Sequence, residues 1–209
     1  MNAPLRERKA NIWARDPFDW YVEEPYASDL LFSVEKFVGT IWDPACGQGN
    51  ILQSALTHGY RVVGTDIVKR VDCYWFRAEI DFPFFSGQAL AQNLVFNSPF
   101  YRGKGTEVFI RKALTLASGK VAAFTDLKFL SGAGRASGLY AEHPPMRIYM
   151  ITPRPSCPPG EYLKAGNKAE GGTADWVWLV WDLTAPKGDT RFIWLRRSDE
   201  AGKFDGVAA

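Results

Sequence analysis

Residues 41–49 read Ile-Trp-Asp-Pro-Ala-Cys-Gly-Gln-Gly, a pattern that predicts a buried strand, a tight loop and a helix that begins at Asn50. Glycine allows a positive φ and lets a ligand approach the main chain closely. The start of the helix adds unpaired N–H groups and the positive end of a dipole. This stretch therefore predicts a nucleotide-like cofactor site that receives an anionic group such as a carboxylate or phosphate.

A second buried strand is expected at residues 61–67, after a helix whose apolar residues fall on one face. Strand, helix and strand form a βαβ unit, in which the crossover is right-handed and the two strands are parallel. Asp66 ends the second strand 19 residues after Gly47, where a carboxylate can accept hydrogen bonds from both ribose hydroxyls of a nucleoside. The next residue, Ile67, is expected at the same site.

Asp81 and Phe82 follow as a second candidate pair. The Asp81 carboxylate is suited to accept from the exocyclic amine of an adenine, with Phe82 packed on the ring. An acid at this place can also be an ordinary turn residue, and Asp81 lacks the diagnostic spacing of Asp66. Asp81 is therefore either an adenine-binding residue or a turn residue.

Asn97-Ser98-Pro99-Phe100 comes directly after the apolar strand Leu94-Val95-Phe96. Asn and Pro commonly end a strand and turn the chain. The same four residues also offer side-chain and backbone carbonyl acceptors beside an aromatic ring. An exocyclic amine on a planar base needs such acceptors, because its lone pair is delocalised until the amine becomes pyramidal. An unstacked base would lie on the Phe100 ring.

Two of these motifs resemble those of a known enzyme family. Residues 43–49 resemble the S-adenosylmethionine (SAM) binding motif of class I methyltransferases. Asn97-Ser98-Pro99-Phe100 looks like the Asn-Pro-Pro-Phe/Tyr motif of the amino-methyltransferases that modify adenine N6 in DNA. The resemblance extends from about Trp20 to Trp181. The set of motifs as a whole is similar to that of small methyltransferases found in phages and prophages. Ser98 replaces the first proline of the motif, but a backbone carbonyl is still present and Pro99 restrains residue 98 to extended conformations.

The resemblance implies roles for individual residues. Asn97 and the carbonyl of residue 98 would accept from the target amine, and Phe100 would stack on the base. In the cofactor site, Asp66 would hold the ribose and Asp81 the adenine of SAM. The cofactor-binding set implied in this way is Asp43, Pro44, Ala45, Cys46, Gly47, Gly49, Asp66, Ile67, Asp81, Phe82 and, from the N-terminal motif, Pro25.

The expected fold is a single α/β domain of the Rossmann-like methyltransferase type. It should have a mostly parallel seven-stranded sheet, helices on both faces and a C-terminal antiparallel strand pair. The domain is expected at residues 18–196, between flexible tails at 1–17 and 197–209. A first helix is expected to start at Ser28 or Asp29, and Thr106 is expected to be the N-cap of a later helix. Residues 71–85 show no clear periodicity of apolar residues. Residues 147–152 and 175–181 predict the final strands, with a further edge strand at 192–195.

Composition limits the other classes. Net charge is +2, so a nucleic-acid partner must be argued from a local basic cluster. Three cysteines without CxxC spacing exclude a disulfide framework and predict no metal site. The absence of a signal sequence or a long apolar run predicts a cytoplasmic protein without a membrane partner. The sequence carries no indication of the oligomeric state.

The sequence hypothesis is therefore SAM-dependent methylation of adenine N6 in DNA, on a single-stranded or flipped base and with low or short sequence specificity. RNA adenine, cytosine N4 and a protein glutamine amide would use the same acceptors. A nicotinamide-dependent oxidoreductase is disfavoured because Leu52 occupies the position of the third fingerprint glycine. An inactive module that binds SAM and nucleic acid is the non-enzyme alternative. Basic residues in expected loops are candidates for phosphate contacts: Arg102, Lys104, Arg135, Arg154, Lys164 and Lys168.

Overall fold

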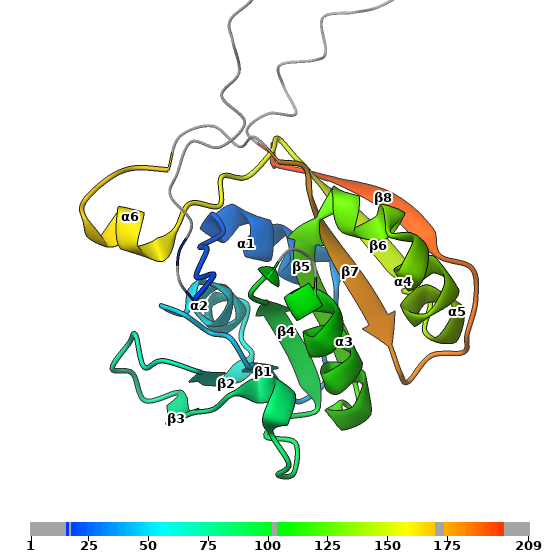
Figure 1. Cartoon of the computed structure of the whole chain (residues 1–209), viewed down its shortest axis with the longest axis horizontal. Helices are drawn as coiled ribbons and strands as arrows, with labels where there is room; N and C mark the ends of the chain where they lie inside the picture. Colours follow the sequence, from blue (N-terminus) through cyan, green and yellow to red (C-terminus); the bar gives the residue numbers. More distant parts are fainter. Residues whose placement is uncertain (1–15, 17, 102–103, 170–173, 199–209) are drawn as a thin grey trace, which may run out of the picture.

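The computed structural model describes residues 16, 18–101, 104–169 and 174–198. Their helices and strands follow one another along the chain as α1 (Pro25–Val34), β1 (Thr40–Asp43), α2 (Asn50–Thr57), β2 (Arg61–Asp66), β3 (Phe76–Glu79), η1 (Phe82–Phe84), β4 (Asn93–Asn97), α3 (Lys104–Leu116), β5 (Lys120–Asp126), η3 (Leu127–Ser131), α4 (Ala133–Ser137), α5 (Leu139–Glu142), β6 (Arg147–Thr152), α6 (Gly160–Lys164), β7 (Trp176–Asp182) and β8 (Arg191–Arg196). Figure 1 shows how they are arranged.

All the strands belong to one sheet, in the order β3-β2-β1-β4-β5-β7-β6-β8. Strands β3, β2, β1, β4 and β5 are parallel, and β7 runs antiparallel between β5 and β6. The α/β class, the parallel half and the antiparallel β6–β7 pair confirm the prediction. The described residues contain eight strands, one more than the seven expected, because the aperiodic stretch before residue 80 supplies β3.

Helices cover both faces of the sheet. Helices α1 and α2 pack on one face with Ile41, Val95 and Phe124. Helix α3, together with η1, η3 and α5, packs on the other face with Trp42, Leu94 and Phe96. Neighbouring residues of one strand face opposite layers because successive side chains of a strand alternate. In β7, Trp178 joins the first layer and Leu179 the second, so the tryptophans of this strand pack in the layers on the two faces of the sheet.

Some element boundaries differ from those expected. Helix α1 begins at Pro25, because proline needs no N–H partner in the first turn, and it ends at Val34. Thr106 lies inside α3 and is fully buried, so it is no N-cap. Residues 88–92, before β4, form no helical turn, and residues 90–92 are bends.

Residue 16 belongs to the folded part of the chain. Asp16 is buried, and its carboxylate accepts from the backbone N–H groups of Phe18, at 2.8 Å, and Trp20, at 3.1 Å. The expected N-terminal tail, residues 1–17, therefore includes at least one residue, Asp16, that packs against the domain. Most of the two expected tails, at residues 1–15 and 199–209, lies outside the described residues. No helix in the described ranges is long and apolar enough to cross a bilayer.

Candidate active site

The parallel strands end in polar residues along one edge of the sheet. Strands β1, β2 and β4 end at Asp43, Asp66 and Asn97. A pocket with about 760 Å³ of empty space, counting its open mouth, lies at this edge. The pocket lining includes twelve of the fifteen predicted site residues, namely Asp43, Pro44, Ala45, Cys46, Gly47, Gly49, Asp66, Ile67, Asp81, Phe82, Asn97 and Pro99. Binding outside the carboxyl ends of strands is typical of parallel α/β sheets.

The loop between β1 and α2 forms one wall. Gly47 and Gly49 have φ values of +51° and +95°, a region that other residues rarely adopt. The loop is held by hydrogen bonds from Gly49 N–H to the Cys46 carbonyl, at 2.7 Å, and from Ala45 N–H to Asp43 Oδ1, at 3.0 Å. The loop therefore leads straight into the first turn of α2, whose leading N–H groups have no partner within the helix.

Asp66 is already engaged within the chain. Its Oδ2 accepts from Gly47 N–H at 2.8 Å, and its Oδ1 accepts from Val68 N–H at 3.0 Å and from Arg70 at 2.6 Å. Both side chains of the Asp66–Arg70 ion pair are less than a tenth exposed. The Arg70 guanidinium also lies over the Trp20 ring. A ribose hydroxyl that binds Asp66 must therefore compete with Arg70, a residue that the sequence did not single out.

Asn97 has one satisfied end and one unsatisfied end. Its Nδ2 donates to Glu23 Oε2 at 2.8 Å and to the Tyr21 carbonyl at 3.0 Å. Since both partners are acceptors, the amide nitrogen must face them. The oxygen Oδ1 is buried and has no hydrogen-bond partner within the described part of the chain. An orphaned buried acceptor carries a free-energy penalty that a ligand donor would remove.

Buried carboxylates give the pocket an unusual electrostatic character. Glu23 and Asp43 are both almost completely buried. Burial raises the pKa of Glu23 to about 7, and the hydrogen bond from Asn97 opposes this shift. Burial also raises the pKa of Asp43 well above its ordinary value, with further repulsion from Glu23 and Asp66. Perturbed carboxyl groups that converge in a pocket are typical of functional sites.

Three predicted site residues are not in the pocket lining. Pro25 is exposed at the start of α1. Ser98 is buried, and its hydroxyl lies 3.2 Å from that of Thr106 in α3. Phe100 packs its ring against Tyr21 and Trp176. The structure therefore places the predicted base-stacking ring in an aromatic cluster beside the pocket.

The predicted adenine pair, Asp81 and Phe82, lies at the start of η1 and lines the same pocket as the glycine loop. Asp81 is exposed at the pocket, whereas Phe82 is buried to 1% exposure. The Phe82 ring makes edge contacts with Trp42 and a tilted contact with Phe109. Phe82 lines the pocket with part of a side chain that belongs mainly to the core.

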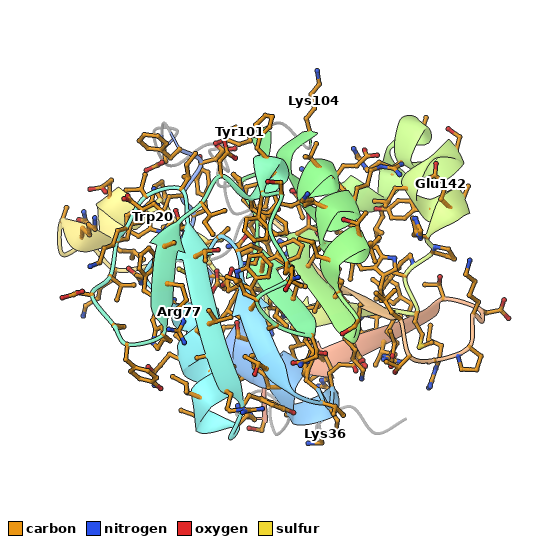
Figure 2. The ribbon with its side chains drawn as sticks, turned by 90° about the horizontal axis from the view of Figure 1, so that it is seen from below. Trp20, Lys36, Arg77, Tyr101, Lys104 and Glu142 are labelled. Carbon is orange, nitrogen blue, oxygen red and sulfur yellow. The ribbon has the colours of Figure 1, made fainter. Side chains whose placement is uncertain are left out.

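Residues 18–23 form a further wall of the pocket, which was not expected from the sequence. Asp19 accepts from the Tyr101 N–H through Oδ2. Val22 N–H donates to the Pro158 carbonyl and Gly160 N–H to the Trp20 carbonyl, both at 2.9 Å. Figure 2 shows Trp20 and Tyr101 toward one end of the molecule and Lys36 at the other. The available signal was Glu23 directly after the apolar residues Trp20-Tyr21-Val22, but this local pattern does not indicate which partner the acid meets.

Cysteine and metal chemistry find no support in the described ranges. Cys46 and Cys157 are buried, and burial raises the pKa of each thiol above its ordinary value, so neither is a reactive thiolate. The part of the chain that the structure describes contains no group of His, Cys, Asp and Glu suited to a metal ion.

The chain matches no protein-family model and no curated protein. Among solved structures, it is similar to a putative RNA methyltransferase from Pyrococcus horikoshii, with a TM-score of 0.54, 17% identity and coverage of 76% of this chain and 80% of that one. It is also similar to a modification subunit of a putative type I restriction enzyme from Vibrio vulnificus, with a TM-score of 0.56 and 13% identity. That match covers 83% of this chain and 46% of the subunit, so the chain spans about half the subunit's length.

The chain has the fold of class I SAM-dependent methyltransferases. This methyltransferase fold accounts for the position of the pocket, since the glycine loop and the strand ends that form it belong to the common sheet. At this level of identity the likeness concerns the fold alone. The substrate must be argued from the residues of this pocket.

Proposed function

We propose that this protein transfers a methyl group from SAM to the N6 amine of adenine in DNA. The observation that carries the proposal is the buried, unpartnered Asn97 Oδ1, held in the pocket by an amide whose nitrogen is fixed by Glu23 and Tyr21. An acceptor of this kind suits an amine donor, because the amine satisfies it and is aligned by it.

The residues around the pocket fit the cofactor. The β1–α2 loop and the first N–H groups of α2 suit the carboxylate of a methionine moiety. The carboxyl groups of Asp43 and Asp66 line the same pocket, and the cationic sulfonium centre of SAM bound there would favour their ionised forms. SAM supplies an activated methyl group, so the protein has to provide alignment and electrostatics.

The contact with DNA is proposed for the face around the pocket mouth. Lys104 is exposed at the start of α3, and Figure 2 shows it beside Tyr101. Three of the other predicted cations have partners of their own: Arg135 binds the Phe129 carbonyl, Arg154 pairs with Asp175, and Lys164 pairs with Glu161. Lys168 is exposed, and Arg102 lies outside the described residues. Lys104 and Lys168 are therefore the preferred phosphate contacts, which would position the strand without reading its sequence.

The test supplies labelled SAM with unmethylated DNA, RNA and protein, followed by digestion and identification of the labelled product. Label in N6-methyladenine from DNA is expected, and Asn97→Ala should reduce it by about a hundredfold or more. Asn167→Ala is the matched control, because Asn167 is exposed and bonds only to a nearby carbonyl. Label in RNA, in N4-methylcytosine or in glutamine would contradict adenine in DNA as the substrate and would identify the substrate instead. SAM binding without any methyl transfer would favour an inactive module.

A further inference from the structure

Glu23 occupies a costly position for an acid. Its side chain is 5% exposed, and no Lys or Arg of the described ranges forms an ion pair with it. Asp43 at the end of β1 and Cys157 after β6 face it, and both experience repulsion when Glu23 ionises. A buried charge without a cation lowers the stability of the fold. A carboxylate in such a place therefore calls for an explanation other than stability.

Its main contact is with Asn97. Glu23 Oε2 accepts from Nδ2 at 2.8 Å, and the Tyr21 carbonyl accepts from the same nitrogen at 3.0 Å. An ionised carboxylate has only acceptor sites, so a reversed Asn97 amide would set oxygen against oxygen. With Glu23 removed, Nδ2 would keep only the Tyr21 carbonyl and the weaker acceptor Cys157 Sγ, at 3.9 Å, among its partners in the described residues.

We infer that Glu23 is a positioning residue for methyl transfer, whose carboxylate holds the Asn97 amide so that Oδ1 is presented to the substrate amine. The inference rests on the proposed function, since it gives Asn97 Oδ1 its task. Glu23 acts through Asn97, and it lies in the segment that closes the pocket. This arrangement makes the acceptor ready before the substrate arrives.

The arrangement predicts a pH dependence. The pKa of Glu23 is raised to about 7 by burial. Below that pH the protonated carboxyl group can donate as well as accept, and it then tolerates the reversed amide. Above it, only the productive orientation is favoured. The kcat should therefore rise with pH through about 7, while SAM affinity should change little.

The kinetic test compares Glu23→Ala and Glu23→Gln with Glu24→Gln, the neighbouring acid, whose carboxylate instead accepts from Ser156 N–H. Glu23→Ala should lower kcat by about tenfold or more with a Kd for SAM within about threefold of the unsubstituted protein. Glu23→Gln should restore part of kcat, because its amide oxygen can still accept, and should remove the pH midpoint near 7. Glu24→Gln should keep that midpoint. An unchanged kcat in Glu23→Ala, or an unchanged midpoint in Glu23→Gln, would overturn the inference.

An NMR measurement tests the same contact without any substrate. The side-chain N–H resonances of Asn97, assigned by their loss in Asn97→Ala, should shift with a midpoint near pH 7 in the unsubstituted protein and stay constant in Glu23→Gln. A shift that persists in Glu23→Gln would reject the Glu23–Asn97 pairing. Failure of the unsubstituted protein to methylate adenine, with the titration intact, would instead reject the proposed function.

Discussion

At the scale of single residues, Asp66 and its partner Arg70 qualify the predicted cofactor site. The carboxylate stands at the expected place, but two backbone N–H groups and a guanidinium already use it. The spacing from Gly47 predicted that Asp66 would accept from ribose hydroxyls, and in the structure its Oδ2 accepts from Gly47 N–H. No spacing rule predicts that an arginine four residues later turns back to the same carboxylate.

We expect Arg70→Ala to bind SAM more tightly than the unsubstituted protein. The substitution frees Asp66 Oδ1 for a ribose hydroxyl, and a charged hydrogen bond of this kind corresponds to roughly 1.5 kcal/mol, or about tenfold in Kd. Isothermal titration calorimetry with SAM measures the change, with Arg77→Ala on β3 as the control for loss of a positive charge. Weaker binding in Arg70→Ala alone would mean that Arg70 contacts the cofactor itself.

Ser98 permits a test of the acceptor assigned to residue 98. The proposed acceptor is a backbone carbonyl, whereas the side chain only reaches Thr106. Ser98→Ala should keep kcat within about threefold and lose about 1 kcal/mol of unfolding free energy, the usual contribution of a hydrogen bond. Activity assays and urea denaturation measure the two quantities. A loss of kcat as large as that of Asn97→Ala would assign a direct role to the hydroxyl.

At the scale of elements, the β1–α2 loop depends on close contact as well as on backbone freedom. A Cβ at Gly47 would lie 2.7 Å from Trp20 Nε1, within the segment that closes the pocket. Strand β3 was missed because it depends on packing more than on local pattern. The helix start at Pro25 follows a local preference, proline in the first turn, which the choice of Ser28 or Asp29 as the start overlooked. The strands that were predicted well are those with long apolar runs, since these must be buried wherever the chain goes.

Gly47→Ala should weaken SAM binding by about tenfold or more, because it strains the loop and displaces Trp20. Gly59→Ala is the matched control: Gly59 also has a positive φ, of +83°, but its Cβ would meet nothing within 4 Å. That control should lose about 1 kcal/mol of stability and keep its SAM affinity. Equal loss of affinity in both variants would mean that backbone strain alone explains the effect.

At the scale of the whole molecule, the buried acids reduce the stability of the fold. Glu23 has a raised pKa in the folded state, so the folded chain binds this proton more tightly than the unfolded chain. The stabilisation is fully present below pH 4.5 and is lost as the pH rises to about 7. The difference of 2.5 pKa units, from 4.5 to about 7, corresponds to roughly 3 kcal/mol.

The free energy of unfolding of Glu23→Gln minus that of the unsubstituted protein should therefore be larger at pH 8 than at pH 4.5. We expect this difference to grow by roughly 3 kcal/mol between the two pH values. Urea denaturation of both proteins at the two pH values measures this change. Asp43 also has a raised pKa, but it is present in both proteins, so subtracting their free energies of unfolding reduces its contribution. A constant difference between the two proteins would show that Glu23 does not titrate in this range.

The sequence alone determined the α/β class, the βαβ unit around residues 41–49 and twelve of the residues that line the pocket, because apolar runs, glycines and strand-end acids act locally. The tertiary structure decided which partners these residues meet. Asn97 and Glu23 are 74 positions apart, yet they share a hydrogen bond. Only the folding of residues 18–24 over the strand ends brings them together and leaves Asn97 Oδ1 as the unsatisfied acceptor. Such contacts depend on long-range packing, and no local pattern of residues encodes them.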